Sequence, residues 1–557
     1  MNRKYLFLLC LIVILAGILR FVGLSQFPPS LSHDEVAIGY NGWSIYQTGK
    51  DEYGKQFPLL FRSFDDYKLP GYIYVTSISQ ALFGINEFAV RFPSAFLGTL
   101  TVPCLFLLVL SMIKQKDIYF DSKKISAETF SLLCSFMLAI SPWHINFSRA
   151  AFESNASLFF IVLGALFLFL SREKKWVFFL SALSFVASIY FYYTARVLVP
   201  GLLIVYALLY REEIRSHLKT AFIACLFGII LLLPLIPSMF TTGNARVSQV
   251  SIFESDIVRV PYWEAIVQNN FAPSAVIFFN KYMAYITHFS DNYLKNFNLD
   301  YYFSNGTGPM GLLYLWEIPF FFLGIVLLLK NRRWGYFVLL WFFTVPLVGG
   351  LTVGQPNALR TLPNSIPASI FTSYGLLACF IWISKKRWYK PVIIIGVGIF
   401  LFFFVRFLSL YFLYTSHETA EKWGDGHKQL ASYLTEHADI YDNVYVTGAN
   451  WRPYIYMLYY MKYPPQRYIE DGNQNSFSNL SFGSADWDED TTSLSDSINV
   501  RLKNNDSMLI VLTPFEYEEE LKKIQRNEVP YSFQLVEIID GTYITPRFVA
   551  VTIVQEE

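Results

Sequence analysis

The stretch Met1–Glu35 reads MNRKYLFLLCLIVILAGILRFVGLSQFPPSLSHDE and decides the class of the fold. Its apolar run over residues 5–23 is long enough to cross a bilayer and follows two cations. A polar loop then carries the acidic pair Asp34-Glu35. Ionisable groups beside a bilayer are costly and by default indicate a functional site. The stretch therefore predicts a membrane protein with chemistry at a membrane surface.

The composition of the whole chain gives the same class. Of its 557 residues 54% are hydrophobic and 16% charged, whereas a soluble domain carries about 25% charged residues. The net charge of +1 gives no reason to expect a nucleic-acid partner. The sequence contains no Walker motif, no dinucleotide glycine motif and no zinc-type Cys/His spacing. The five cysteines all lie in apolar stretches and are expected to pack as small hydrophobic residues.

Apolar stretches predict about eleven transmembrane helices. Clusters of Lys and Arg occupy every second connection, which places the N-terminus in the cytoplasm and the tail outside by the positive-inside rule. The expected spans are 5–23, 92–113, 127–146, 154–171, 176–192, 197–210, 220–240, 311–329, 334–353, 364–384 and 391–415.

Two apolar stretches need a separate interpretation. Counting residues 70–84 as a span would put the cationic loop 114–124 outside, so we expect a juxtamembrane or re-entrant helix there. Residues 1–19 resemble a signal peptide in their charge and apolar run. No small-x-small cleavage site follows them, and we expect an uncleaved first helix.

The chain is expected to consist of a transmembrane core, residues 1–416, and a soluble extracytoplasmic α/β domain, residues 417–557. The core has two large outward segments, a loop over 24–91 and a segment over 241–310. The tail contains no catalytic constellation, so we interpret it as a folded cap or an acceptor-docking module. Within it we expect helices at 417–440 and 518–525, strands at 444–446, 508–512, 533–539 and 548–554, and a loop at 471–498.

The acidic pair allows three interpretations from residue type alone. A carboxylate can accept the proton of a hydroxyl or amine that attacks the anomeric carbon of a sugar. Asp34 and Glu35 could also bind a hard divalent cation. Alternatively, Ser32 or Asp34 could simply cap the helix that follows.

Outward cations are candidate phosphate contacts. Lys68 precedes Pro70 at the start of an apolar helix, where it could bind a lipid phosphate or extend toward the interface as many lysines do. Arg360 lies in a turn between two spans and could hold a phosphate with two hydrogen bonds. Arg149 and Glu153 are four residues apart, so they could also pair along one helix face.

In combination these features resemble the GT-C superfamily, in its protein O-mannosyltransferase branch (dolichyl-phosphate-mannose-protein mannosyltransferase-like) and in the related lipid A aminoarabinose transferases. Those proteins carry an Asp-Glu pair in the first outward loop, matched by Asp34-Glu35. They then carry a lysine followed by a proline and an aromatic-rich helix, matched by Lys68-Leu69-Pro70-Gly71-Tyr72-Ile73-Tyr74. Residues 83–94 are similar to the juxtamembrane helix of the family. The resemblance covers residues 1–415 and is clearest over the first hundred.

The resemblance implies a GT-C fold and an inverting glycosyltransferase. A hexosyl or pentosyl group would pass from a polyprenyl-phosphate donor to a glycan, lipid or protein acceptor of the cell envelope, on the outer face of the plasma (inner) membrane. Asp34 would be the general base, supported by Glu35. Lys68 and Arg360 would bind the departing phosphate, whose charge grows in the transition state.

The resemblance is less specific at other positions. The aminoarabinose enzymes have an acidic residue directly before the lysine, where this chain has Tyr67 and carries Asp66 one position further back. The candidate donor or acceptor contacts are Asp66, Tyr67, Arg149, Glu153 and Arg246. The sequence identifies no particular cofactor, although a divalent cation is allowed.

Two functions of other classes stay open on the sequence. A transporter or lipid flippase is the first, although such proteins place polar groups in broken helices at mid-membrane and this chain places its charges in outward loops. The second is a membrane-anchored binding protein whose tail does the work and whose transferase core is inactive.

Overall fold

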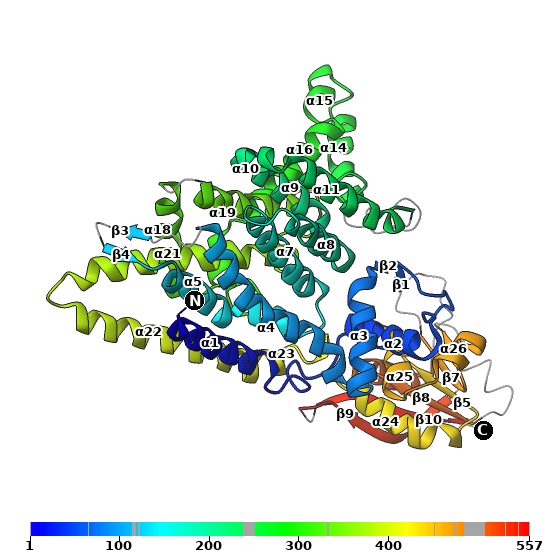
Figure 1. Cartoon of the computed structure of the whole chain (residues 1–557). Helices are drawn as coiled ribbons and strands as arrows, with labels where there is room; N and C mark the ends of the chain where they lie inside the picture. Colours follow the sequence, from blue (N-terminus) through cyan, green and yellow to red (C-terminus); the bar gives the residue numbers. More distant parts are fainter. Residues whose placement is uncertain are drawn as a thin grey trace. The chain divides into compact units, whose positions relative to one another are not determined.

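The computed structural model describes residues 2–64, 66–113, 118–120, 123–237, 251–330, 333–449, 452–472, 475–483, 507–529, 531–543 and 545–555. The chain forms two compact units that alternate along the sequence (Figure 1). The first unit comprises Met1–Val22, Leu59–Tyr72 and Phe92–Tyr411, and the second comprises Gly23–Pro58, Ile73–Arg91 and Phe412–Glu557.

The first unit contains the apolar helices. Each of the stretches expected to span the membrane is a helix or a consecutive pair of helices within the described residues. They are α1 (Arg3–Phe21), α4 (Glu87–Met112), α5 (Ala127–Ile140) with α6 (Pro142–Ser148), α7 (Glu153–Leu170), α8 (Val177–Phe191), α9 (Ala195–Leu209), α11 (Leu218–Leu232) with η1 (Leu233–Leu235), η2 (Leu315–Glu317) with α18 (Ile318–Leu329), α19 (Arg333–Thr344) with α20 (Pro346–Gly350), η3 (Leu362–Asn364) with α21 (Ser365–Ser384), and α22 (Tyr389–Ser409).

Length and hydropathy support a polytopic membrane protein. In the described part of the chain six helices are long and apolar enough to cross a bilayer, and the pair α5–α6, bent by 57°, would be a seventh. The helices α8, α9 and η2–α18 are apolar but shorter. The predicted class, a polytopic helical protein with a C-terminal α/β region, is confirmed, whereas the count of about eleven spans stays a prediction.

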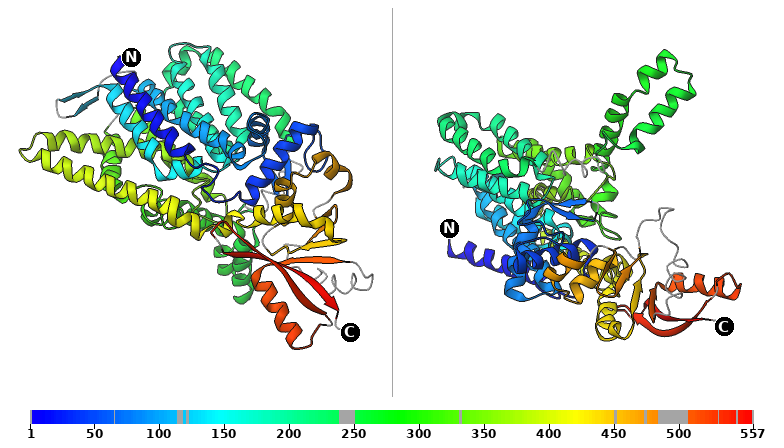
Figure 2. Two further views of the ribbon diagram at one scale, coloured as in Figure 1. Left: turned by 90° about the horizontal axis from the view of Figure 1, so that it is seen from below. Right: turned by 90° about the vertical axis from the view of Figure 1, so that its right-hand side faces the viewer.

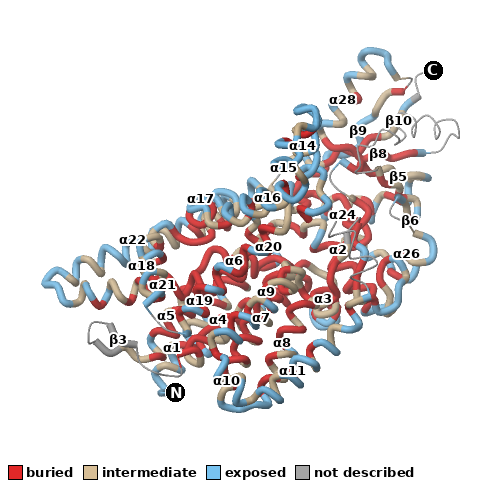
Figure 3. Tube along the Cα trace, turned by 90° about the horizontal axis from the view of Figure 1, so that it is seen from above, coloured by how far each residue is buried: buried red, intermediate tan, exposed pale blue. Residues whose placement is uncertain are grey.

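Close helix packing holds the first unit together. The helices α18 and α21 cross where Gly324 faces the backbone of Phe371 and Gly375 faces the backbone of Phe320, and a Cβ atom at either glycine would collide with a carbonyl group. Small residues allow such close approach between helices in a membrane. By contrast, Phe407 is the only buried residue of α22, and the rest of this helix is exposed or half-buried (Figure 3).

Shorter elements complete the first unit. Residues 70–84 are helical as expected, in α3 (Pro70–Phe83), which continues into the second unit. The others are the hairpin of β1 (Phe61–Ser63) and β2 (Asp66–Lys68), the hairpin of β3 (Ile118–Phe120) and β4 (Lys123–Ile125), α10 (Arg211–Ser216), α14 (Asp256–Gln268), α15 (Pro273–Phe278), α16 (Lys281–Lys295), α17 (Leu299–Phe303) and, reaching into the second unit, the π-helical turn Leu410–Thr415.

The second unit is built on a six-stranded sheet in the order β6-β7-β5-β8-β10-β9. The strand β5 is parallel to β7 and to β8, and the other neighbours are antiparallel. The last two strands form a long twisted hairpin (red in Figure 2). The strands are β5 (Asn443–Val446), β6 (Ser476–Phe477), β7 (Leu480–Phe482), β8 (Met508–Leu512), β9 (Tyr531–Asp540) and β10 (Pro546–Gln555).

Helices cover this sheet and fill the rest of the unit. They are α2 (His33–Thr48), α23 (Ser416–Glu418), η5 (Glu421–Trp423), α24 (His427–His437), η6 (Ala438–Ile440), α25 (Pro453–Tyr460), α26 (Pro465–Asp471) and α28 (Pro514–Gln525). All four expected strands of the tail are confirmed. The loop expected at 471–498 is wrong where β6 and β7 form, because Phe477, Leu480 and Phe482 are buried there. Residues 484–498 lie outside the described residues.

The two units divide the first outward loop. Residues 23–58 and 73–91 pack with the C-terminal residues, and residues 59–72 pack with the membrane helices. The second unit is therefore more than the tail, because it also contains α2 with the acidic pair. The predicted boundary at 416/417 stays a prediction.

Candidate functional site

The first turn of α2 separates the two acids of the pair. Ser32 is the N-cap residue: its hydroxyl accepts from the Glu35 backbone N–H at 3.4 Å, and the Glu35 carboxylate accepts from the Ser32 N–H at 3.0 Å. This reciprocal capping box fixes the start of the helix. It also directs Glu35 inward, where the residue is only 2% exposed.

A buried arginine completes the environment of Glu35. Arg91 Nε donates to Glu35 Oε1 at 2.9 Å, and an Arg91 terminal nitrogen donates to Oε2 at 3.1 Å. The same guanidinium donates to the carbonyl groups of Leu24 at 3.1 Å, Pro28 at 2.8 Å and Ser30. Arg91 is fully buried. Both oxygens of Glu35 are thus taken up by the protein itself.

Asp34 has the opposite environment. Its side chain is 54% exposed, with His33 Nε2 3.8 Å from its carboxylate. The N-terminal end of a helix stabilises a negative charge in its first turn. Asp34 therefore presents an accessible carboxylate from a rigid turn, as a general base requires.

The acidic pair does not fit a shared metal site. Glu35 already accepts from Arg91 and from the Ser32 N–H, so a cation of the protein itself compensates its charge. Among the described residues no group of three or more His, Cys, Asp or Glu side chains could hold a metal ion. The divalent cation allowed by the sequence stays a prediction that rests on no identified ligands.

In the first unit, Lys68 lies at the end of a short hairpin. The strand β2 pairs with β1 so that Lys68 stands opposite Phe61, and the lysine is buried. The carbonyl of the preceding Tyr67 accepts from the Tyr193 hydroxyl at 2.8 Å. Asp65 and the side chain of Asp66 lie outside the described residues, so the contact predicted for Asp66 is untested.

Tyr193, which bonds to this hairpin, lines a cavity of about 300 Å³. Two arginines line it, Arg196 and Arg360. The Arg360 guanidinium donates to the Thr352 hydroxyl and to the Val353 carbonyl, each at 2.9 Å, so its position is fixed by the loop between two helices. The remaining lining residues are Tyr192, Thr194, Val197, Ser251, Phe253, Val348, Leu351 and Thr352.

Tyr193 links the backbone beside Lys68 to this cavity, which the Lys68 side chain does not line. The phosphate contacts of Lys68 and Arg360 stay predictions. Sequence reasoning missed Arg196, which also lines the cavity. Its guanidinium carbon lies 4.4 Å from the centre of the Tyr193 ring. The available signal was its position as a single arginine in a short outward connection, like Arg360.

Two other predicted contacts are placed differently. Arg149 is fully buried and donates to the carbonyls of Leu19 at 2.9 Å and Val22 at 2.8 Å, so it ties down the C-terminal end of α1. Glu153 is the first residue of α7, whereas Arg149 follows α6, so the two do not share a helix face. Arg246 lies outside the described residues.

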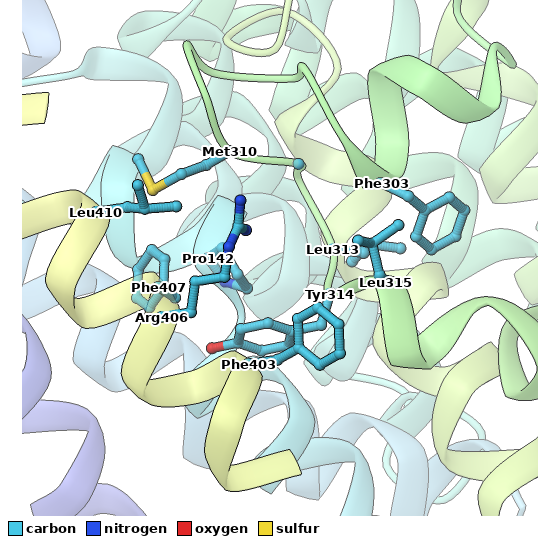
Figure 4. Close-up of a pocket in the computed structure, with 11 residues that line it drawn as sticks. Pro142, Phe303, Met310, Leu313, Tyr314, Leu315, Phe403, Arg406, Phe407 and Leu410 are labelled. Carbon is cyan, nitrogen blue, oxygen red and sulfur yellow. The ribbon is translucent and has the colours of Figure 1, made fainter. Parts of the chain in front are cut away.

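Two further cavities lie along α22. One of about 30 Å³ has the Arg406 side chain pointing toward Pro142 and Met310 (Figure 4). The other is an apolar groove of about 740 Å³ between α22 and the helices α5, α18 and α21. The two share Leu315 and Phe403. An apolar groove on exposed membrane helices suits a hydrocarbon chain rather than a polar reaction.

The chain thus has a polytopic helical unit with a cationic cavity and a second unit that carries an exposed acid and an α/β sheet. A family described as dolichyl-phosphate-mannose-protein mannosyltransferase matches residues 68–239 of this chain. That stretch includes Lys68 and Arg196 but not the acidic pair. No curated protein sequence matches the chain.

Solved structures resemble the whole chain. ArnT from Cupriavidus metallidurans bound to undecaprenyl phosphate is similar at 12% identity with a TM-score of 0.54, over 98% of this chain and 97% of that chain. The same protein in the apo state gives 13% identity and a TM-score of 0.52, over the same shares. The oligosaccharyltransferase of Archaeoglobus fulgidus tethered with an acceptor peptide gives 11% identity and a TM-score of 0.50, over 100% of this chain and 74% of that chain. These likenesses confirm the GT-C fold.

Proposed function

We propose that the protein is an inverting glycosyltransferase of a cell membrane that uses a polyprenyl-phosphate-linked monosaccharide. The observation that carries this proposal is the cavity lined by Arg196 and Arg360, adjoined through Tyr193 by the strand that carries Lys68. Guanidinium groups bind phosphate through paired hydrogen bonds. The ArnT neighbour was solved with undecaprenyl phosphate, which supports a lipid-phosphate donor here.

The reaction follows from the chemistry of these groups. A hydroxyl or amine of the acceptor attacks the anomeric carbon of the donor sugar and gives its proton to the Asp34 carboxylate. The bond between the anomeric carbon and the phosphate oxygen breaks, and the polyprenyl phosphate leaves with the electron pair. Lys68, Arg196 and Arg360 stabilise the charge that this phosphate gains, which lowers the barrier.

The acceptor is a glycan, a lipid or a protein of the cell envelope. The Archaeoglobus fulgidus neighbour was solved with an acceptor peptide and the matching family is named for transfer to protein, which supports a protein among these. We place the reaction on the outer face of the plasma (inner) membrane, because the cations that indicate the cytoplasmic side lie in the alternate connections. The apolar groove along α22 provides a place for a lipid chain.

A transfer assay tests the proposal. Purified protein in lipid is given a panel of polyprenyl-phosphate sugars and an acceptor extract from the cell envelope, and released polyprenyl phosphate is measured. We expect release from one donor, an at least hundredfold loss in Asp34→Asn (general-base catalysis contributes about 10²–10⁴-fold) and normal folding of that variant. Unchanged release by Asp34→Asn would refute the base assignment. Adding EDTA to the same assay tests the dependence on a divalent cation.

A further inference from the structure

The helix that carries Asp34 is buried far more completely than its sequence suggests. Residues 35–45 of α2 are all buried, although the helix contains Asn41, Ser44 and two glycines. A polar helix in such a place needs specific partners on every side. The C-terminal residues supply part of that cover, since α2 packs against α25 and α26.

The contact between α2 and α25 leaves no room for adjustment. A Cβ atom at Gly39 would lie 2.7 Å from the ring of Tyr459 on α25. The Tyr40 hydroxyl donates to the Tyr463 carbonyl at 3.2 Å, just beyond that helix. The position of α2 along its middle is therefore fixed by the C-terminal chain.

A buried carboxylate joins the two helices further along. Glu52 Oε1 accepts from the Asn41 amide at 3.0 Å, and the Glu52 N–H donates to the Asn41 side-chain oxygen at 3.1 Å. The other oxygen, Oε2, accepts from the Tyr454 hydroxyl of α25 at 3.4 Å. Both Asn41 and Glu52 are almost fully buried.

The C-terminal chain also reaches the acidic turn itself. The indole ring of Trp423 lies over the Arg91 guanidinium, with 5.8 Å between the ring centre and the guanidinium carbon. Arg91 is the group that holds Glu35 and the three carbonyls of the preceding loop. An aromatic face attracts a cation directly and shields it from water.

Tyr456 lies close to the same turn. Its ring stacks on His427 with 4.0 Å between ring centres, and a Cβ atom at Gly424 would contact its hydroxyl. Burial raises the pKa of the Tyr456 phenol, and the charges of Glu35 and Asp34 raise it further. Residues 423–427 and α25 thus form one wall beside the two acids.

We propose that the C-terminal domain is part of the catalytic unit and that Trp423 is a positioning residue for Asp34, acting through Arg91 and Glu35. This inference rests on the proposed function, because it takes Asp34 as the base. It replaces the expectation of a folded cap or an acceptor-docking module with a domain that builds the turn carrying Asp34. The residues that carry it are Trp423, Tyr454, Tyr456 and Tyr459.

The test compares Trp423→Ala, Trp423→Phe and the matched control Tyr433→Ala. Tyr433 stacks on His437 at 4.5 Å on α24 of the same unit, and no described contact joins it to Arg91 or α2. A small displacement of a reacting group costs up to about a hundredfold in rate. We expect Trp423→Ala to lower kcat for polyprenyl-phosphate release about tenfold or more with the donor KM unchanged. Trp423→Phe should restore most of kcat, and Tyr433→Ala should match the wild type.

A second measurement is independent of activity. Hydrogen exchange of the amides of residues 33–45 should accelerate in Trp423→Ala and stay at the wild-type rate in Tyr433→Ala. Release at the wild-type rate by Trp423→Ala would overturn the inference while the proposed function stands. If the wild type releases nothing from any donor, the proposed function fails. In that case unchanged hydrogen exchange in Trp423→Ala would also overturn the role of Trp423 in holding α2. Faster exchange limited to α2 would support that role.

Discussion

The ion pair of Arg91 and Glu35 provides the sharpest test of how the acidic turn is held. In Arg91→Ala the Glu35 carboxylate, 2% exposed, loses the cation that compensates its charge. Removing one partner of a buried ion pair costs about 3–5 kcal/mol. The variant also releases the carbonyls of Leu24, Pro28 and Ser30, and each hydrogen bond from a charged donor is worth about 1.5–3 kcal/mol.

We expect Arg91→Ala to lower the free energy of unfolding of the second unit by at least about 4 kcal/mol, because these terms overlap rather than add. The assay is denaturant unfolding of the full chain in detergent. Unfolding is detected by the proteolysis of α2 and by the hydrogen exchange of its amides. Arg91→Ala with Glu35→Gln should cost less than the two single changes summed, since the double variant leaves no uncompensated charge.

The control for this prediction is Arg526→Ala in the same unit. Arg526 is 69% exposed and lies 3.8 Å from Glu528, so its loss should cost no more than about 1 kcal/mol. If Arg91→Ala proved as mild as Arg526→Ala, the buried pair would not be what fixes the turn. Additive effects in the double variant would equally contradict direct coupling between Arg91 and Glu35.

Two other perturbations test the phosphate site and the C-terminal domain. Lys68→Ala and Arg360→Ala should each lower kcat/KM for the donor about 10- to 100-fold, which is the value of one charged hydrogen bond, and leave the acceptor KM unchanged. The control is Arg259→Ala on the exposed face of α14. An equal loss of kcat/KM in the control would contradict a specific phosphate site. Burial lowers the pKa of His427 to about 4. Because the unfolded chain binds this proton near pH 6.5, stability is complete above that pH and falls as pH decreases toward 4, by on the order of 3 kcal/mol. Urea unfolding at several pH values should show this fall in the wild type and lose it in His427→Phe, and a fall of equal size in the variant would refute the assignment.

Much of the fold could be predicted because its signals are local. Apolar runs such as 391–415 are too long for a soluble core, and the alternating positions of Lys and Arg predict their orientation across the bilayer. The strands β8 and β10 are continuous apolar or alternating runs and were predicted within two residues of their bounds. Sequence reasoning missed the helix α25. The segment Pro453–Tyr460 is short and rich in tyrosine, and this composition also suits a strand.

The burial of α2 shows where sequence reasoning stops. Nothing in its pattern indicates a covered helix, because the helices that cover it, α25 and α26, lie far along the chain. Asn41 meets Glu52, which in turn meets Tyr454. The cavity of Arg196 and Arg360 is a similar case. Arg196 lies in the first turn of α9 and Arg360 in a loop far along the chain, and the two line one cavity only in the folded protein. Spacing along one segment cannot predict such a pair.

The different roles of Asp34 and Glu35 follow from helix geometry together with one capping signal. Successive residues of an α-helix point about 100° apart, so two adjacent acids in a first turn point in different directions. The sequence Ser32-His33-Asp34-Glu35 has the spacing of a capping box, which commits the fourth residue to the backbone of the first. Once Glu35 is turned inward it requires a cation, and Arg91 at 2.9 Å provides it. Asp34 is then the exposed acid of the pair, as the proposed role of a general base requires, while Glu35 anchors the turn.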